Sequence, residues 1–334
     1  MPDTPAFLDS DRPDVPDIVV PRGITPFHLP GRPVRGRLVR LGRLAHTLLS
    51  RHDNPAVVTA LAGQALALVA ALGAALKFRG SFSVQAKGDG PVRMLLADCT
   101  DAGALRFYAR PDPEALAALL AEMPEPSAAD LLGEGYIAFT ADQGADMDRY
   151  QGIVAIEGEQ LSDMALHYFA ASEQLGCAIR LACAHDGTAW QAAALVLEKV
   201  AGAGGVDPEL NDAEQAEAWH TATTLFGTLT DAELLDEDLA PDRLLYRLFG
   251  AEGVSLELPR ALAYGCRCSR QRLAGILEGF EQDDLDHMTV GRDIIMTCEF
   301  CKYDFHFDRR EVRGTVKSAA SGDGQGQEQG ESQR

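Results

Sequence analysis

The sequence predicts an α/β (α+β) core domain with antiparallel sheets around an alanine-rich buried helix, followed by a helical linker and a small C-terminal metal-binding domain. Three observations predict this order: one long uncharged run, several segments in which polar and apolar residues alternate, and four cysteines close together near the C-terminus. The chain has 334 residues, which is enough for roughly two domains of about 150 residues each. Its 46% hydrophobic and 24% charged residues are typical of a globular protein.

The charge balance and the cysteine content limit the function. The 50 acidic residues outnumber the 30 basic ones and give a net charge of −20, which repels nucleic acid. Seven cysteines are too few for a disulfide framework in a chain of this length. The first thirty residues contain five aspartates and lack the apolar stretch of a secretory signal, so we expect a cytoplasmic protein in a reducing environment.

Both ends of the chain have compositions that do not favour a core. Residues 1–34 hold eight of the 17 prolines, so we expect a Pro-rich extended arm that contributes little to the core. Residues 318–334 contain no apolar residue larger than alanine, and a disordered tail is expected. After the arm, five arginines follow without an acidic residue between them: Arg35, Arg37, Arg40, Arg43 and Arg51. A stripe that binds phosphate or a partner is one interpretation, but we favour a strand and a helix with solvated basic faces.

The core domain, expected over residues 35–201, begins with a long helix. Asn54-Pro55 is a typical helix start, and the 21 residues from Ala56 to Leu76 carry no charge. That length allows a membrane-spanning helix. Nine of the 21 residues are alanine, and Thr59 and Gln64 interrupt the run, so we favour a central helix buried on all sides and expect no membrane partner.

Alternating residues after this helix predict antiparallel strands joined by tight turns. The expected strands cover residues 81–87, 91–96, 105–108, 136–140, 150–157, 177–184 and 190–197, with a helix at 160–174. Cys99, Cys177 and Cys183 lie in these apolar stretches, where an unpaired cysteine usually acts as a small buried hydrophobic residue.

The linker, expected over residues 202–257, begins with the run from Gly202 to Gly205, which predicts a flexible joint. Residues 206–257 then hold 13 acidic residues against Arg243 and Arg247. The leucines of this segment keep helical spacing, so we expect helices that dock on the core and are weakly stable alone, since like charges oppose compaction. An ordinary helical linker with a solvated acidic face is the alternative.

Residues 258–317 hold the most informative feature, two closely spaced cysteine pairs. Cys266 and Cys268 form C-x-C, Cys298 and Cys301 form C-x-x-C, and 29 residues separate the pairs. Four soft thiolates at this spacing suit tetrahedral Zn²⁺, so we expect a zinc-binding domain with one ion per reduced chain. Loss of the metal is expected to unfold a domain of this size.

The chemistry of such a site favours redox change over hydrolysis. Four thiolates leave no open position for water, which argues against hydrolytic zinc catalysis and against an enzyme. His306 could replace one ligand, but the alternation of Tyr303, Phe305 and Phe307 favours a position on the other side of a strand. Thiolates remain nucleophilic, so each pair is poised to form a disulfide, although four cysteines allow three pairings. Four basic residues could offset the negative charge of the site: Arg267, Arg270, Arg272 and Lys302.

The segments Cys266-Arg-Cys-Ser-Arg270 and Thr297-Cys-Glu-Phe-Cys301 occur together with three supporting features, namely the alanine-rich helix after Asn54-Pro55, Gln85-Ala-Lys-Gly-Asp-Gly-Pro91 and Tyr168-Phe-Ala-Ala-Ser-Glu-Gln174. With these motifs, roughly residues 35–312 resemble the heat shock protein 33 family of redox-regulated holdase chaperones. The Pro-rich arm and the tail lie outside the pattern.

The resemblance implies a metastable linker over residues 202–257 and a zinc-binding redox-switch domain over residues 258–317. It also implies that oxidation under stress forms the disulfides Cys266–Cys268 and Cys298–Cys301, releases zinc and activates the chaperone. The expected activity is ATP-independent binding of unfolding client proteins, which prevents their aggregation. The resemblance also allows a homodimer of the oxidised form.

Two functions from different classes remain. The stress-activated holdase is favoured because the acidic linker lies directly before a redox-capable zinc site. The alternative is a constitutive zinc-ribbon module that binds nucleic acid or a protein partner, but residues 258–317 hold ten basic and ten acidic residues and so have no basic excess. A thioredoxin-like oxidoreductase ranks third, because the C-x-x-C pair follows no βαβ pattern.

Overall fold

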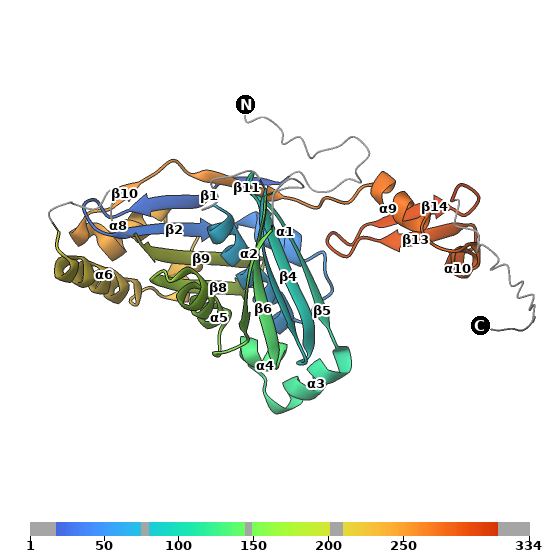
Figure 1. The fold of residues 1–334 in the computed structure, drawn as a ribbon, viewed down its shortest axis with the longest axis horizontal. Coiled ribbons are helices and arrows are strands. Elements are labelled where there is room, and N and C mark those ends of the chain that lie inside the picture. The colour runs from blue at the N-terminus through green and yellow to red at the C-terminus, as the bar shows by residue number, and fades with distance from the viewer. Residues whose placement is uncertain (1–17, 75–79, 144–148, 201–209, 313–334) are drawn as a thin grey trace, which may run out of the picture. The chain divides into compact units, whose positions relative to one another are not determined.

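The computed structural model describes residues 18–74, 80–143, 149–200 and 210–312, and these residues form two compact units (Figure 1). The larger unit comprises the described residues up to 267 together with 299–302, and the smaller unit comprises 268–298 and 303–312. The first 17 residues, the expected joint at 202–205 and the expected tail at 318–334 lie outside the described residues.

An 11-stranded sheet forms the frame of the larger unit, with strand order β7-β6-β3-β4-β5-β11-β1-β2-β9-β8 and with β10 paired to β1. Every neighbouring pair is antiparallel except β11 and β5, which are parallel. The strands are β1 Val19–His28, β2 Val34–Arg40, β3 Ser81–Gly88, β4 Val92–Thr100, β5 Ala104–Pro111, β6 Gly135–Asp142, β7 Tyr150–Ala155, β8 Cys177–His185, β9 Trp190–Lys199, β10 Ser255–Leu256 and β11 Arg260–Tyr264. The predicted antiparallel strands are therefore confirmed.

Helix α2, Ala56–Gly73, is the buried central helix that the sequence predicts. Fourteen of its 18 residues are buried. It packs against β3, β4 and β5 and against β2, β8 and β9, so it covers strands on both sides of β11 (Figure 1). Its length and mean hydropathy of 2.0 would suit a membrane span, but 78% of it is buried by the protein itself. Gly63 allows α2 to pack closely against β8, because a Cβ atom at position 63 would lie 2.3 Å from the Cys183 sulfur.

The core holds further helices, two of which, α3 and α4, the sequence does not predict. Asp112 caps α3 by accepting a hydrogen bond from the Ala115 amide, and Ser127 caps α4 in the same way. The helix expected at 160–174 is observed as α5 and a π-helical turn. The bounds are α1 Arg43–Leu49, α3 Pro113–Glu122, α4 Ala128–Leu132, α5 Leu161–Tyr168 and the turn Phe169–Glu173.

The N-terminal segment differs from the expected arm in its described part. Residues 19–28 form β1, and its Ile24 and Phe27 side chains are buried in the core, so the expectation that this segment contributes little is wrong there. Prolines are tolerated in β1 because, at their positions, no hydrogen bond between strands requires the N–H group that proline lacks. Pro21 lies within the register shift between Val20 and Ile24, and Pro26 uses its carbonyl to accept a hydrogen bond from Glu257.

Two of the arginines after this segment, Arg37 and Arg40, form specific contacts within the fold. Neither a stripe that binds phosphate or a partner nor solvated basic faces would predict these contacts. Arg37 makes two hydrogen bonds to the Glu198 carboxylate, at 2.7 and 2.9 Å. The Arg40 guanidinium donates to the backbone carbonyls of Glu233, Leu234 and Leu239. Burial lowers the pKa of Arg40, whereas the nearby acidic side chains oppose that shift.

The acidic segment folds into three helices, α6 Asp212–Phe226, α7 Asp231–Leu235 and α8 Pro241–Phe249. Asn211 and Thr230 cap the first two by accepting backbone hydrogen bonds. The apolar faces of these helices are buried against β1, β2, β8 and β9 in one core cluster. The residues of this segment in that cluster are Ala222, Phe226, Leu229, Leu234, Leu244, Leu245, Leu248 and Phe249.

Strand β11 belongs to the core sheet, although the sequence analysis placed residues 260–264 in a separate domain that begins at 258. Ala263 and Tyr264 pair with Ala104 and Leu105 of β5. Arg260 extends this attachment, because its guanidinium donates to the backbone carbonyls of Ala74 and Asp101.

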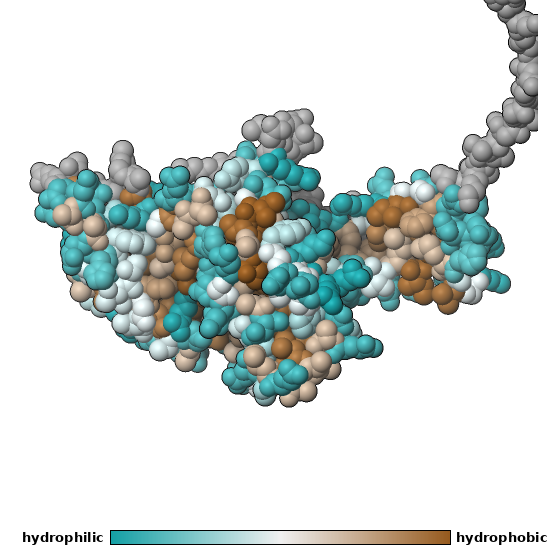
Figure 2. Space-filling model, turned by 60° about the horizontal axis from the view of Figure 1, so that its bottom comes forward, coloured by the Kyte–Doolittle hydropathy of each residue, from teal (hydrophilic) through white to brown (hydrophobic). Residues whose placement is uncertain are grey.

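The smaller unit contains a three-stranded sheet and two short helices. Its elements are α9 Arg270–Leu277, α10 Gln282–His287, β12 Thr289–Val290, β13 Asp293–Thr297 and β14 Asp304–Asp308. Leu277, Leu285, Ile294, Phe305 and Phe307 form its small buried core. Large apolar side chains of this unit are also exposed, among them Ile276, Phe280 and Val290. Hydrophobic patches between hydrophilic areas are visible on the molecular face in Figure 2.

Candidate metal centre

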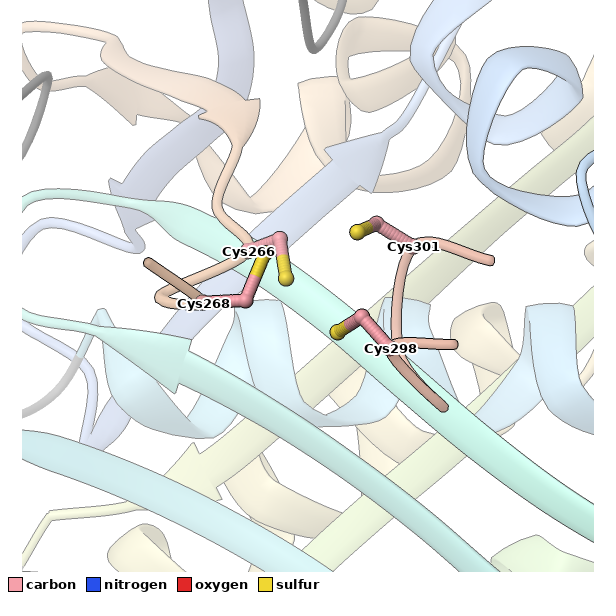
Figure 3. Close-up of side chains that lie close together, drawn as sticks. All are labelled: Cys266, Cys268, Cys298 and Cys301. Carbon is pink, nitrogen blue, oxygen red and sulfur yellow. The ribbon is translucent and has the colours of Figure 1, made fainter. Parts of the chain in front are cut away.

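Four cysteine side chains converge on one point. The sulfur atoms of Cys266, Cys268, Cys298 and Cys301 all lie within 4.8 Å of one another. Figure 3 shows the two pairs on separate chain segments, with the sulfur atoms turned toward the space between them. Cys266, Cys298 and Cys301 are buried, and Cys268 is half-buried. The structure thus brings together the four residues that the sequence singled out.

Strand β11 positions the first pair. Its last residue, Tyr264, is followed by Gly265, whose amide donates to the Leu105 carbonyl of β5 at 2.8 Å. A Cβ atom at position 265 would lie 2.6 Å from the Ala104 carbonyl carbon, so a larger residue cannot occupy this position without displacing the backbone. Cys266 therefore leaves the sheet at a fixed point, directly beside β5.

The hairpin of β13 and β14 positions the second pair. Thr297 and Asp304 are the last paired residues, and the Thr297 hydroxyl donates to the Asp304 carboxylate at 2.6 Å. The Cys298 amide donates to the Tyr303 carbonyl at 2.9 Å, which closes a tight loop that contains both cysteines. Lys302 completes this loop with a φ of 53°, a left-handed conformation that is uncommon for a residue with a side chain.

Residues of the core hold the tip of this loop through its backbone. Arg51 donates from Nε to the Cys301 carbonyl at 2.9 Å, and His52 donates from Nε2 to the Phe300 carbonyl at 3.1 Å. The His52 ring packs on Phe107, with a centroid distance of 4.1 Å. Burial lowers the pKa of His52 to about 4, so its ring is neutral at pH 7.

Side chains between the cysteines contact β4 and β5. Arg267 bonds through its guanidinium to the Asp98 carboxylate at 2.5 Å, and the Asp98 side chain is only 8% exposed. Arg106 also faces Asp98, with Nε 3.4 Å from the same carboxylate oxygen. The Arg106 guanidinium lies over the Phe300 ring, 4.3 Å from its centroid. Each cysteine pair is thus flanked by a side chain that reaches the core sheet.

Other residues expected near the site have separate contacts. His306 lies on β14 between the buried Phe305 and Phe307, is exposed, and is not part of the sulfur group, which agrees with the strand interpretation. Arg270 lies over the Phe307 ring, and Lys302 pairs with Glu299 at 2.6 Å. These contacts give both basic residues a structural role besides any effect of their charge on the cysteines.

The three other cysteines lie in the core. Cys99 is buried, and Cys177 and Cys183 are half-buried. Burial raises the pKa of each of these thiols to about 12. Cys99 is therefore the small buried hydrophobic residue that the sequence predicts, and all three thiols stay protonated at neutral pH.

The donor set fits a soft, four-coordinate metal ion. Four thiol sulfurs supply every ligand of a closed tetrahedral site, which is the donor chemistry of structural zinc. A bound metal ion would also stabilise the smaller unit, because a domain of about 40 residues rarely buries enough surface to fold alone. We therefore treat the four cysteines as the candidate metal centre.

Comparison with known proteins identifies the family of this chain. The family model described as Hsp33 protein matches residues 23–308. A "33 kDa chaperonin" of Caulobacter vibrioides (strain NA1000 / CB15N) is 40% identical over 290 residues, which cover 85% of this chain and 94% of that protein. This chain belongs to the Hsp33 family.

Other Hsp33 relatives agree. The "33 kDa chaperonin" of Pseudomonas fluorescens is 34% identical over 280 residues, covering 83% of this chain and 88% of that protein. The crystal structure of the 33 kDa chaperonin from Thermotoga maritima matches the Hsp33 fold described here with a TM-score of 0.71, over 87% of this chain and 96% of that one, at 20% identity. The names of the relatives support a chaperone function.

Four residues of this Hsp33 chain contact the cysteine motifs without having been connected with them from the sequence, namely Arg51, His52, Asp98 and Arg106, of which only Arg51 was singled out, as part of the arginine run. Asp98 carried a weak signal, because it is an acidic residue inside the apolar run from Leu95 to Cys99. An acidic residue in such a run needs a buried partner. Nothing in the sequence identifies Arg267 as that partner.

Proposed function

We propose that this protein is a redox-regulated, ATP-independent holdase chaperone of the cytoplasm. In the reduced form, Cys266, Cys268, Cys298 and Cys301 bind one Zn²⁺. Oxidation joins Cys266 to Cys268 and Cys298 to Cys301, which ends metal binding and exposes a surface for unfolding client proteins. The observation that carries this proposal is the convergence of the four sulfur atoms within 4.8 Å. The membership of the Hsp33 family supports it.

The cysteine pairs carry the chemistry of the switch. A bound Zn²⁺ keeps its thiolate ligands deprotonated and links the two segments that carry them. One thiolate of a pair attacks a peroxide oxidant to give a sulfenic acid, and the second thiolate then displaces its hydroxyl group to form the disulfide. Each pair of thiolates thereby loses two electrons, and with two protons taken up from the solvent one peroxide molecule becomes two molecules of water. A disulfide sulfur is no longer a thiolate, so the oxidised pairs cease to be metal ligands.

The linker responds because two opposing forces balance its docking. Burial of an apolar side chain such as Leu248 or Phe249 contributes about 1.5–3 kcal/mol. The 13 acidic residues within 206–257 repel one another and oppose this compact arrangement. We propose that residues 202–257 are a metastable linker and that residues 258–317 act as the redox switch, with β11 held in the core sheet until oxidation. Release of the linker would uncover the apolar side chains of β1, β2, β8 and β9.

One experiment tests the whole proposal. Zinc content and suppression of aggregation are measured before and after treatment with peroxide, using a chemically unfolded protein that aggregates on dilution. We expect one zinc per reduced chain, little suppression by that form, zinc loss on oxidation, and suppression without ATP. Peptide mapping of the oxidised chain should find both short disulfides.

The control is a variant in which Cys99, Cys177 and Cys183 are replaced by alanine, since these thiols lie outside the sulfur cluster. It should keep both the zinc and the switch. Equal suppression by the reduced and oxidised forms would reject the switch and favour a constitutive zinc module. Disulfides that mainly join Cys268 to Cys298 would reject the proposed pairing.

A further inference from the structure

The two cysteine motifs are connected to each other through the core sheet. Arg267 contacts Asp98 on β4, Asp98 lies beside Arg106 on β5, and Arg106 covers the Phe300 ring. Asp98 and Arg106 are also directly paired in the register of β4 and β5. A continuous chain of contacts therefore runs from the residue inside C-x-C to a residue inside C-x-x-C.

Arg267 is the single residue between the two cysteines that a Cys266–Cys268 disulfide would join. Their sulfur atoms lie within 4.8 Å of each other, whereas a disulfide bond is about 2.05 Å long. The sulfur atoms must therefore approach each other, and a ring that spans Arg267 alone must take up that change in the dihedral angles at and beside Arg267. Such a change redirects the guanidinium that holds Asp98.

The contact between Arg267 and Asp98 resists this change. Asp98 is nearly fully buried, and removal of its closest partner leaves a buried carboxylate with Arg106 alone, whose Nε lies at 3.4 Å. Breaking one side of a buried charge pair is strongly unfavourable. The same free energy must appear in the redox equilibrium of the cysteines, because coupling between two events is reciprocal.

We propose that Asp98 and Arg106 are positioning residues that hold the two cysteine motifs in their reduced conformation and so set the oxidation threshold of the switch. Asp98 acts on Cys266 and Cys268 through Arg267. Arg106 acts on Cys298 and Cys301 through Phe300. This inference rests on the proposed function, because it concerns the redox equilibrium of the same four cysteines.

The test is the reduction potential of each pair in the full-length protein. The protein is equilibrated in glutathione buffers at fixed free zinc, its thiols are trapped, and each pair is quantified by mass spectrometry. In Asp98→Asn and in Arg267→Gln, the Cys266–Cys268 pair should become about tenfold easier to oxidise, which is about 30 mV toward more negative potential. The double variant should shift no further than either single variant, because both remove one contact.

The sign of the shifts separates positioning from a simple charge effect. Asp98→Asn removes a negative charge and Arg267→Gln removes a positive one, so an electrostatic effect on the thiolates would move the two potentials in opposite directions. Shifts of opposite sign overturn the proposal. Arg267→Lys, which keeps the charge and can reach the carboxylate, should recover part of the wild-type potential.

Glu198→Gln is the matched control, because it breaks a half-buried ion pair with Arg37 in the same sheet, between β2 and β9. Shifts in the Asp98 and Arg267 variants that merely equal the control shift overturn the proposal. If Asp98→Asn fails to fold, Arg267→Gln decides, since its side chain is partly exposed. Phe300→Leu should shift the Cys298–Cys301 pair more than the other pair, and an equal effect on both contradicts the role of Arg106.

Failure of the proposed function would look different. In that case the wild-type protein itself would bind no zinc or would form no disulfides within the pairs. A wild type that switches normally, with variants whose potentials are unchanged, would reject only the positioning role.

Discussion

The ring of Phe27 on β1 stacks on the ring of Phe249 at the end of α8, with centroids 5.6 Å apart and an interplanar angle of 25°. Both side chains are buried, and they join the first strand of the sheet to the last helix of the linker. Phe249→Ala should therefore weaken linker docking by about 3–5 kcal/mol, the usual cost of removing a buried phenylalanine. We expect faster hydrogen exchange in residues 212–249 and partial suppression of aggregation by the reduced protein.

Tyr246→Ala is the control for this variant, because Tyr246 lies on the same helix with 71% of its surface exposed. It should leave exchange and activity close to wild type. A reduced Phe249→Ala protein with faster exchange but no gain in suppression would separate linker release from client binding.

A second prediction concerns Arg40, whose guanidinium donates to three backbone carbonyls around α7. Arg40→Lys keeps the charge but cannot satisfy three carbonyls, and unsatisfied buried acceptors cost about 1–3 kcal/mol. Hydrogen exchange in residues 231–239 should become faster, with less oxidant needed for half-maximal activity. Arg43→Lys, at an exposed position on α1, should change neither quantity.

A third prediction separates the four clustered cysteines from the others. A Cys298→Ser, Cys301→Ser variant removes half of the donor set, and metal analysis should find less than one tenth of a zinc per chain. The small buried core of residues 268–298 and 303–312 should then lose protection against proteolysis, since metal binding contributes free energy to folding. Full zinc content in this variant would contradict the assignment.

The fourth prediction is the pH dependence of thiol labelling in the folded protein. The pKa of Cys99, Cys177 and Cys183 is raised to about 12, so at pH 8 about one molecule in ten thousand has the thiolate at a given position. Alkylation of these residues should be slow and should rise about tenfold per pH unit up to pH 10. In denaturant, the midpoint should return to the ordinary value near 9.0. A folded-state midpoint near 9 would show that these thiols are solvated.

The same shifts define their contribution to stability. A raised folded pKa means that the neutral thiol is preferred in the folded state. This contribution is fully present below the unfolded pKa, near 9.0, and is lost as the pH rises toward 12. Alkaline unfolding should therefore be less steep in a variant with alanine at all three positions.

Local patterns were sufficient to predict much of the fold. Helix α2 was predictable because its alanine-rich run is contiguous, and β3 to β5 because alternation and turn residues lie within one stretch of sequence. The role of β1 was not, because Pro21 is tolerated only through a register shift against β11. That partner lies more than 230 residues further along the chain, so no local pattern reports it.

The same limit applies to the candidate site. The spacing of the cysteines was sufficient to predict the cluster of four sulfur atoms, because the two cysteines of each pair lie close together in the sequence. The residues that position them depend on pairs separated by 250 positions for Arg51 and Cys301 and by 169 for Arg267 and Asp98. The position of Asp98 in an apolar run indicates that its carboxylate requires a buried partner. Only the fold shows that this partner is Arg267.

Strand β11 also determines when the sheet can be completed during synthesis. The strands β7-β6-β3-β4-β5 and β1-β2-β9-β8 form two groups that β11 joins in the strand order, yet β11 is made only at residues 260–264. A chain that grows at about 5–20 residues per second from its N-terminus can pair each group earlier. Until β11 arrives, the inner edges of β5 and β1 lack their partner, and such open edges favour aggregation. A nascent chain of this protein thus carries two unpaired strand edges until residue 264 has been made, and the strand that covers both edges leads directly into Cys266.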